Sequence, residues 1–132
     1  MLNQSGITKS SGLTRKTILF DTKLFFALPC MISNSGVEAG SDGKKVVKAG
    51  TPLVGSLVDR DTAFTVGAKD GAVVGIAEHD VDVTAGTANG GIIIFGFIDE
   101  DKLDASVVAL LDTANTDSSK LRDKLTNITF CK

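Results

Sequence analysis

The sequence contains no tryptophan and no tyrosine, and its aromatic residues are seven phenylalanines. Proline is also scarce, with two residues against 14 glycines, although 42% of the residues are hydrophobic. A core of this composition must be filled mainly by valine, isoleucine, leucine and alanine, and the β-branched residues among them favour β-sheets. A chain of 132 residues is long enough for one modest core. The composition therefore predicts one small β-rich domain.

Basic charge and reactive side chains are scarce as well. The formal net charge is −2, so the basic excess typical of general nucleic-acid binders is missing. The single histidine, His79, lies in an acidic stretch, but strand alternation sends it and Asp80 to opposite faces, and no second histidine completes a metal site. The glycine-rich segment 36–44 does not match a phosphate loop, because Lys45 stands where serine or threonine would bind magnesium. We expect no enzyme, no metal and no cofactor.

The two cysteines and one apolar run bear on export. Cys30 and Cys131 lie about a hundred residues apart. We expect two reduced thiols, although a disulfide that links the two flanks of the chain remains an alternative. The apolar run 24–32 is far shorter than the roughly 20 residues that span a bilayer, and Asp21 interrupts the apolar stretch upstream. We expect this run to be a buried strand with an edge or kink at Pro29, and we expect no membrane contact.

The clearest order of elements lies between residues 70 and 98. Asp70-Gly71 has the chemistry of a tight turn with positive φ, and a short apolar run follows it. Residues 79–84 alternate between apolar and polar side chains, which is the period of a strand with one wet face. After a glycine-rich bend, residues 92–98 are almost wholly apolar, which predicts a central strand buried on both faces.

The C-terminal part is predicted to be helical. One face of a first helix is given by the spacing of Leu103, Val107, Leu110 and Leu111. Carboxylates crowd residues 99–104, where they suit the positive end of a helix dipole. A second helix is expected over 117–125, capped by Ser118 or Thr116, and residues 127–130 are expected to form a closing strand.

The N-terminal part has a different composition. Residues 1–23 are polar at first, and they end in an apolar patch at residues 17–20. Because they lack the periodicity of a packed element, they are typical of an extended arm. The predicted organisation is therefore an arm over 1–23 and a compact domain over 24–132.

The stretch from Asp70 to Leu103 resembles the head decoration proteins of tailed bacteriophages, the lambda type. Their middle carries a similar DGA-x-VGI pattern, followed by a glycine and a phenylalanine before an acidic turn. The matching residues here are Asp70, Gly71, Ala72, Val74, Gly75, Ile76, Gly96, Phe97, Glu100 and Asp101. We accordingly expect a mainly β (α+β) domain with one or two short C-terminal helices, similar to a β-clip or β-tulip, with an extended N-terminal arm.

The resemblance also implies a function. Such proteins are structural virion proteins that are made in the host cytoplasm and dock as homotrimers on the outer capsid surface, where they stabilise the head. The implied partner is the major capsid protein, and the arm adds a strand to it, so that backbone hydrogen bonds provide affinity. The residues expected to contact the shell are Thr17, Ile18, Leu19 and Phe20, and those expected to steer association are Lys9, Arg15 and Lys16.

Two other classes stay open on the sequence alone. A small β-rich module that binds a carbohydrate or a cell-surface ligand would usually show exposed aromatic side chains, and here phenylalanine is the one kind present. A small enzyme on a similar scaffold would need a polar cluster that the sequence does not assemble. A monomer with a defined small-ligand pocket would favour these alternatives over the shell protein.

Overall fold

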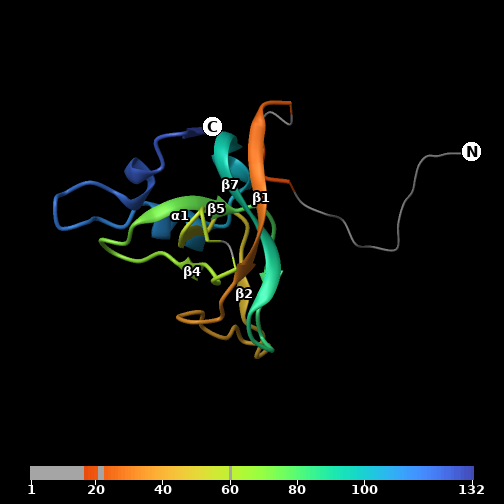
Figure 1. Cartoon of the computed structure of the whole chain (residues 1–132). Helices are drawn as coiled ribbons and strands as arrows, with labels where there is room; N and C mark the ends of the chain where they lie inside the picture. Colours follow the sequence, from red (N-terminus) through yellow and green to blue (C-terminus); the bar gives the residue numbers. More distant parts are fainter. Residues whose placement is uncertain (1–16, 21–22, 60) are drawn as a thin grey trace, which may run out of the picture.

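The computed structural model describes residues 17–20, 23–59 and 61–132. Its main sheet has the strand order β1-β7-β5-β3-β4, with β8 beside β7 (Figure 1). The strands of this sheet are β1 (Phe25–Ile32), β3 (Pro52–Val54), β4 (Thr65–Val66), β5 (Val73–Ala77), β7 (Ala88–Asp99) and β8 (Ile128–Cys131). The other elements are the pair β2 (Val46–Val47) and β6 (Val81–Asp82), the α-helix α1 (Ala105–Leu111) and the 3₁₀ turns η2 (Glu100–Lys102) and η3 (Leu121–Lys124). The prediction of a mainly β fold is confirmed.

The main sheet closes on itself. Ile32 at the end of β1 forms a parallel bridge with Phe64, the residue before β4. The bridge is held by backbone bonds of 2.8 Å from Ser33 N to Phe64 O and from Phe64 N to Met31 O. Because β1 and β4 are the two ends of the strand order, this bridge turns the open sheet into a small barrel-like body.

Two hydrophobic clusters fill the two sides of this closed sheet. The inner cluster takes Ile32, Leu53, Ala77 and Ile92 from β1, β3, β5 and β7, and Phe64 from the position before β4. The outer cluster takes Ile76, Ile93 and Ile98 from β5 and β7, and it is covered by α1 and η3 through Val107, Leu111 and Leu121. Adjacent residues such as Ile92 and Ile93 thus belong to different clusters, although both are fully buried.

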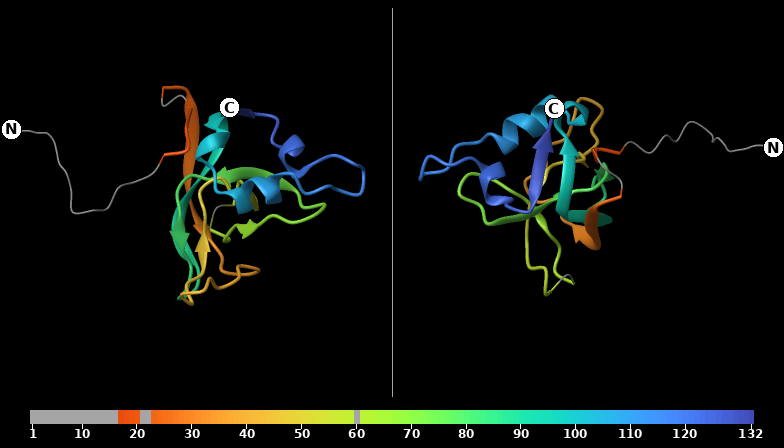
Figure 2. Two further views of the ribbon diagram at one scale, coloured as in Figure 1. Left: turned by 180° about the vertical axis from the view of Figure 1, so that it is seen from behind. Right: turned by 90° about the horizontal axis from the view of Figure 1, so that it is seen from above.

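The central strand of the sheet is β7, and it is paired along both edges. One edge pairs with β1 over residues 88–96, while the other pairs with β5 at Ile92–Ile93 and in parallel with β8 at Gly96–Asp99 (Figure 2). The prediction of a central strand over 92–98 is confirmed. Burial on both faces holds for Ile92 and Ile93, but Phe95 is 41% exposed, so one face of the strand is open at that end.

Residues 17–20 lie along the same edge of β7 as β1, beyond the point where β1 begins. Leu19 forms an antiparallel bridge with Ile98, and Phe20 N donates to Phe97 O at 2.9 Å. β1 then resumes the same antiparallel register at Phe25, opposite Gly96. One edge of β7 is therefore covered by two pieces of chain, with residues 21–24 between them.

This docking moves the expected boundary of the compact domain. Ile18 and Leu19 are 1% and 7% exposed, and both belong to the outer cluster. We expected residues 1–23 to form an arm, but the structure packs 17–20 with the body, because two of these apolar side chains complete the core beside Ile98.

The apolar run 24–32 differs from the expected buried strand. β1 is an edge strand of the main sheet, and Phe25, Phe26, Pro29 and Met31 are exposed. Its C-terminal half contributes Cys30 and Ile32 to the inner cluster. The edge position suits Pro29, because proline lacks the N–H that an interior strand needs.

At the C-terminal end the first helix and the closing strand are confirmed as α1 and β8. The second helix is shorter than predicted, since η3 is one 3₁₀ turn over Leu121–Lys124. Neither Ser118 nor Thr116 caps it; Asp123 Oδ2 accepts instead from Lys120 N at 2.8 Å. Leu121 and Leu125 are buried, as the pattern predicted.

The predicted turn at Asp70 is held by a distant loop. Asp70 has the positive φ of +64° that the turn requires. Its N–H donates to Oδ1 of the buried Asn115 at 2.7 Å, and its carboxylate accepts from the N–H and hydroxyl of Thr116 at 2.8 and 2.7 Å. These bonds, called here the Asp70 clasp, fix the start of β5 to the segment between α1 and η3.

Candidate interaction surface

The described part of the chain exposes an aromatic surface at the end of the β1–β7 pair. Phe20, Phe26 and Phe95 are 60%, 52% and 41% exposed, and we call these three residues the phenylalanine patch. Phe26 and Phe95 are cross-strand partners, so their side chains share one face of the sheet. Phe20 follows Leu19, whose side chain faces the outer cluster, so strand alternation points Phe20 away from that cluster.

A β-bulge explains why the apolar run of β7 opens outward here. The register with β1 shifts between Phe26, opposite Phe95, and Ala27, opposite Ile93, so Ile94 is an extra residue in β7. Gly96 follows with a φ of +151°, a value that favours glycine, and a Cβ there would lie 3.0 Å from Phe25 Cβ. Bulges bend and twist a strand. The two irregularities together separate the buried residues 92–93 from the exposed aromatic end.

The backbone beside the patch is also unpaired on one side. β1 uses one edge for β7, and its other edge is bridged at Ile32 to Phe64. Within the ranges 17–20, 23–59 and 61–132, no strand pairs with the outer edge of residues 25–28. Such an edge presents backbone donors and acceptors to any extended partner.

The predicted contact residues have different positions. Thr17 and Phe20 are exposed, whereas Ile18 and Leu19 are core residues whose side chains a partner would not reach in the folded body. Lys9, Arg15 and Lys16 lie outside the described residues. Of the predicted contact residues, Phe20 thus lies in the phenylalanine patch. Phe26 and Phe95 were not among the predicted contact residues.

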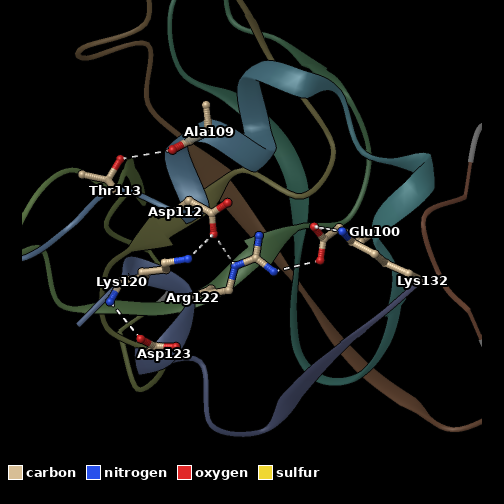
Figure 3. Close-up of polar contacts among 8 residues, drawn as sticks. All are labelled: Glu100, Ala109, Asp112, Thr113, Lys120, Arg122, Asp123 and Lys132. Carbon is tan, nitrogen blue, oxygen red and sulfur yellow. Dashed lines mark hydrogen bonds and ion pairs between the residues drawn. The ribbon is translucent and has the colours of Figure 1, made fainter. Parts of the chain in front are cut away.

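The segments that follow the C-terminal end of β7 carry a charged network. Arg122 Nη1 donates to Glu100 Oε1 at 2.8 Å, and Arg122 Nε lies 2.9 Å from Asp112 Oδ1 (Figure 3). The guanidinium also lies 5.0 Å from the centre of the Phe130 ring. The hydrogen bond from Arg122 lowers the pKa of the Glu100 carboxyl below its ordinary value. The network ties η2, α1, η3 and β8 together, so its role is structural.

Two other carboxylates of the stretch predicted to carry helix-start charge, Asp99 and Asp104, are N-caps of η2 and α1. Asp99 Oδ1 accepts from Asp101 N at 3.1 Å, and Asp104 Oδ2 accepts from Ser106 N at 3.0 Å. Hydrogen bonds from the Ser106 hydroxyl and N–H, and then from Lys48, lower the pKa of Asp104 to about 2. These carboxylates have structural partners and form no acid–base pair.

The residues considered for chemistry have structural partners too. Asp80 Oδ1 accepts from Ala49 N at 2.8 Å, and His79 Nε2 lies 3.7 Å from Glu78 Oε2. Over the described ranges, no group of three or more histidine, cysteine, aspartate or glutamate side chains could hold a metal ion. Cys30 and Cys131 are thiols rather than a disulfide.

The glycine-rich segment 36–44 borders a groove rather than forming a phosphate loop. Its backbone N–H groups at Gly40, Gly43 and Lys44 donate within the loop itself. The groove has a volume of about 850 Å³ and lies between this loop, β2 and the Ser106–Leu110 side of α1. Its volume is in the range of grooves that bind small ligands.

The residues that carry the phage resemblance have structural reasons of their own. Asp70 adopts a positive φ and forms the Asp70 clasp. A Cβ on Gly75 would lie 2.6 Å from Ile93 O, so glycine permits the close approach of β5 to β7. Gly96 has the conformation described above. At these three positions the residue type is explained by the conformation of the turn and the packing of the sheet.

The comparisons with known proteins add no relative. No protein-family model matches the chain, and a search of curated proteins finds no significant match. Among the described residues, no helix has the length and apolarity to cross a membrane.

Proposed function

We propose that this protein is a phage capsid decoration protein, a structural protein that binds the outer surface of the mature head and stabilises it. The observation that carries the proposal is the phenylalanine patch, which lies where residues 1–16 join the body. Three half-exposed phenylalanines amount to roughly 300 Å² of aromatic surface, which is in the range of functional patches on small proteins.

Two further features support a binding role. The charged residues near Glu100 and the residues around His79 are used in caps and ion pairs, so the described chemistry is structural. The DGA-x-VGI pattern and the mainly β fold with a C-terminal helix agree with the decoration-protein resemblance. We extend the proposal to a β-clip-like or β-tulip-like body, a homotrimer at local three-fold positions, and the major capsid protein as partner.

The arm is then proposed to consist of residues 1–16, with Thr17 and Phe20 at its junction with the body. Lys9, Arg15 and Lys16 keep their proposed steering role, because a basic segment accelerates association with an acidic surface. Ile18 and Leu19 act instead as the anchor that holds the arm's root on β7.

The test is attachment to heads. Mature heads of the phage that encodes the chain, prepared without the decoration protein, are incubated with the full-length chain and sedimented. We expect saturable co-sedimentation and heads that withstand heating to a higher temperature. Absence of co-sedimentation at micromolar protein would overturn the proposal. Light scattering of the free protein and microscopy of decorated heads show whether the trimer forms before or on the shell.

The groove supports one alternative, a module for a small carbohydrate or cell-surface ligand. Its walls combine Val66 and Leu110 with the rim lysines Lys44 and Lys48. A glycan array that gave a specific hit, abolished by Leu110→Arg but retained by Phe26→Asp, would favour this alternative. We expect no hit.

A further inference from the structure

We infer that the body itself accepts an extended apolar strand of the shell protein, which pairs with the outer edge of β1 at residues 25–28 and covers the phenylalanine patch. This inference deepens the proposed function and rests on it. In the contact proposed above, the arm adds a strand to the shell protein. In this second contact, the shell protein adds a strand to the main sheet of the body.

The area of the patch argues for a partner that also uses the backbone. A stable interface buries about 800 Å² on each partner, and the patch supplies less than half of that. The unpaired edge of β1 lies directly beside the patch, since Phe26 belongs to both. Pairing of a strand with this edge would add backbone hydrogen bonds, while the phenylalanines would receive its alternate side chains.

The charge of the surface fixes the chemistry of the partner. Between residues 23 and 32 the one charged side chain is Lys23, and the patch itself has none. An acidic or basic segment would lose its hydration on this surface without gaining an ion pair. An extended segment with apolar residues at alternate positions fits both the edge and the patch.

The position of the patch identifies the shell as the source of that strand. Residues 1–16 join the body at Thr17, three positions before Phe20, so a partner held by the arm lies next to this surface. A second copy of the chain is a poorer occupant, because antiparallel pairing of two β1 edges is a two-fold contact and does not build the proposed trimer.

The experiment combines a variant with a measurement on the unaltered chain. The variant Phe26→Asp with Phe95→Asp keeps residues 1–20 and should bind mature undecorated heads at least tenfold more weakly than the wild type. Ala105→Asp is the control, since Ala105 is an exposed residue of α1 and not of the β1–β7 pair, and it should bind like the wild type. Thermal melts of both variants verify that they fold.

Hydrogen exchange on the wild-type protein tests the edge without any substitution. Amides in Phe25–Leu28 that face away from β7 should exchange quickly in the free protein and become protected on heads. Undiminished binding by the double variant, or no added protection at these amides, would overturn the inference while leaving the proposed function intact. A wild type that does not bind heads would overturn both.

Two other outcomes would assign the surface to another occupant and overturn the inference. Protection of residues 25–28 that rises with protein concentration in the absence of heads would indicate a second copy. Protection in the free protein that disappears when residues 1–16 are deleted would indicate the chain's own arm.

Discussion

The middle of β7, at Ile92 and Ile93, and the part that begins at Phe95 have similar apolar sequences but different surroundings. At Ile92 and Ile93 the strand lies between the inner and outer clusters, and both side chains are fully buried. At Phe95 the strand is still flanked by neighbours on both edges, yet one face is open and the aromatic ring is 41% exposed. An apolar strand can therefore serve as core in one half and as a surface in the other, and the bulge at Ile94 separates the two.

The largest effect should come from a charge in the buried middle of β7. Ile93→Asp places a carboxylate at a fully buried position without a partner, so we expect a loss of several kcal/mol in unfolding free energy, enough to unfold a domain of ordinary stability. Urea denaturation followed by circular dichroism measures it. A loss below about 1 kcal/mol would show that β7 is as exposed at Ile93 as it is at Phe95.

The next effect concerns the segment that completes β7. Ile18→Ala should cost about 3 kcal/mol, because it opens a cavity in the outer cluster. Deletion of residues 1–16 should leave the melting temperature nearly unchanged, whereas deletion of 1–20 should lower it clearly. Equal melting temperatures of the two truncated proteins would show that residues 17–20 do not stabilise the body and belong to the arm.

The Asp70 clasp should contribute less. Asn115→Ala removes the buried acceptor of the Asp70 N–H, and we expect a loss of about 1–3 kcal/mol. Thr116→Val is the matched control, since it removes one exposed hydroxyl bond and leaves the backbone bond in place. If both variants lose the same stability, the buried amide has no special role.

Acid should lower the stability of the folded protein through the carboxylates of the Asp70 clasp and of the α1 N-cap, Asp104. Hydrogen bonds from the hydroxyls of Thr116 and Ser106 lower the pKa values of Asp70 and Asp104 in the folded protein. The stabilising contribution of both carboxylates is therefore present above their ordinary pKa of 3.8 and is lost as the pH falls below it, for Asp104 toward about 2. Urea midpoints between pH 7 and 2 should stay level and then fall in that window, and a fall already complete at pH 5 would contradict this.

The smallest effect on stability is expected at the exposed end. Phe26→Asp and Phe95→Asp should each change the unfolding free energy by less than about 1 kcal/mol, because both rings are about half exposed. The same urea titration used for Ile93→Asp gives the comparison. Losses as large as that of Ile93→Asp would mean that the patch is part of the core.

Local patterns predicted some elements well. Val107 and Leu111 form the buried face of α1, with Leu103 buried just before the helix, and Asp70 adopts the positive φ of the predicted turn. Both were predicted from residues close together in sequence, although the turn is also held by the distant Asn115 and Thr116. The helix expected over 117–125 was predicted from two leucines, Leu121 and Leu125. The structure has one 3₁₀ turn there, which begins where Lys120 N donates to Asp123 Oδ2.

The interaction surface could not be predicted in the same way, because exposure there depends on distant segments. Ile18 and Leu19 are buried because β7 extends beyond the end of β1 and leaves an edge for them. Phe26 and Phe95 are exposed because the described elements leave their face uncovered, although the run 92–98 has the same apolar character throughout. Alternation identifies the faces of a strand but not which face another element will cover.

The last residues of β7 have a consequence for how the chain acquires its structure during synthesis. Residues 97–99 are flanked by Ile18–Phe20 on one edge and by β8 on the other, and these two flanking segments are separated by most of the chain. A ribosome releases Ile18 long before it makes Ile128. Ile18–Phe20 therefore cannot pair until β7 has been made, and the sheet is complete only after residues 128–131 have been made. Because these contacts join segments far apart in sequence, folding should be slow for a domain of this size.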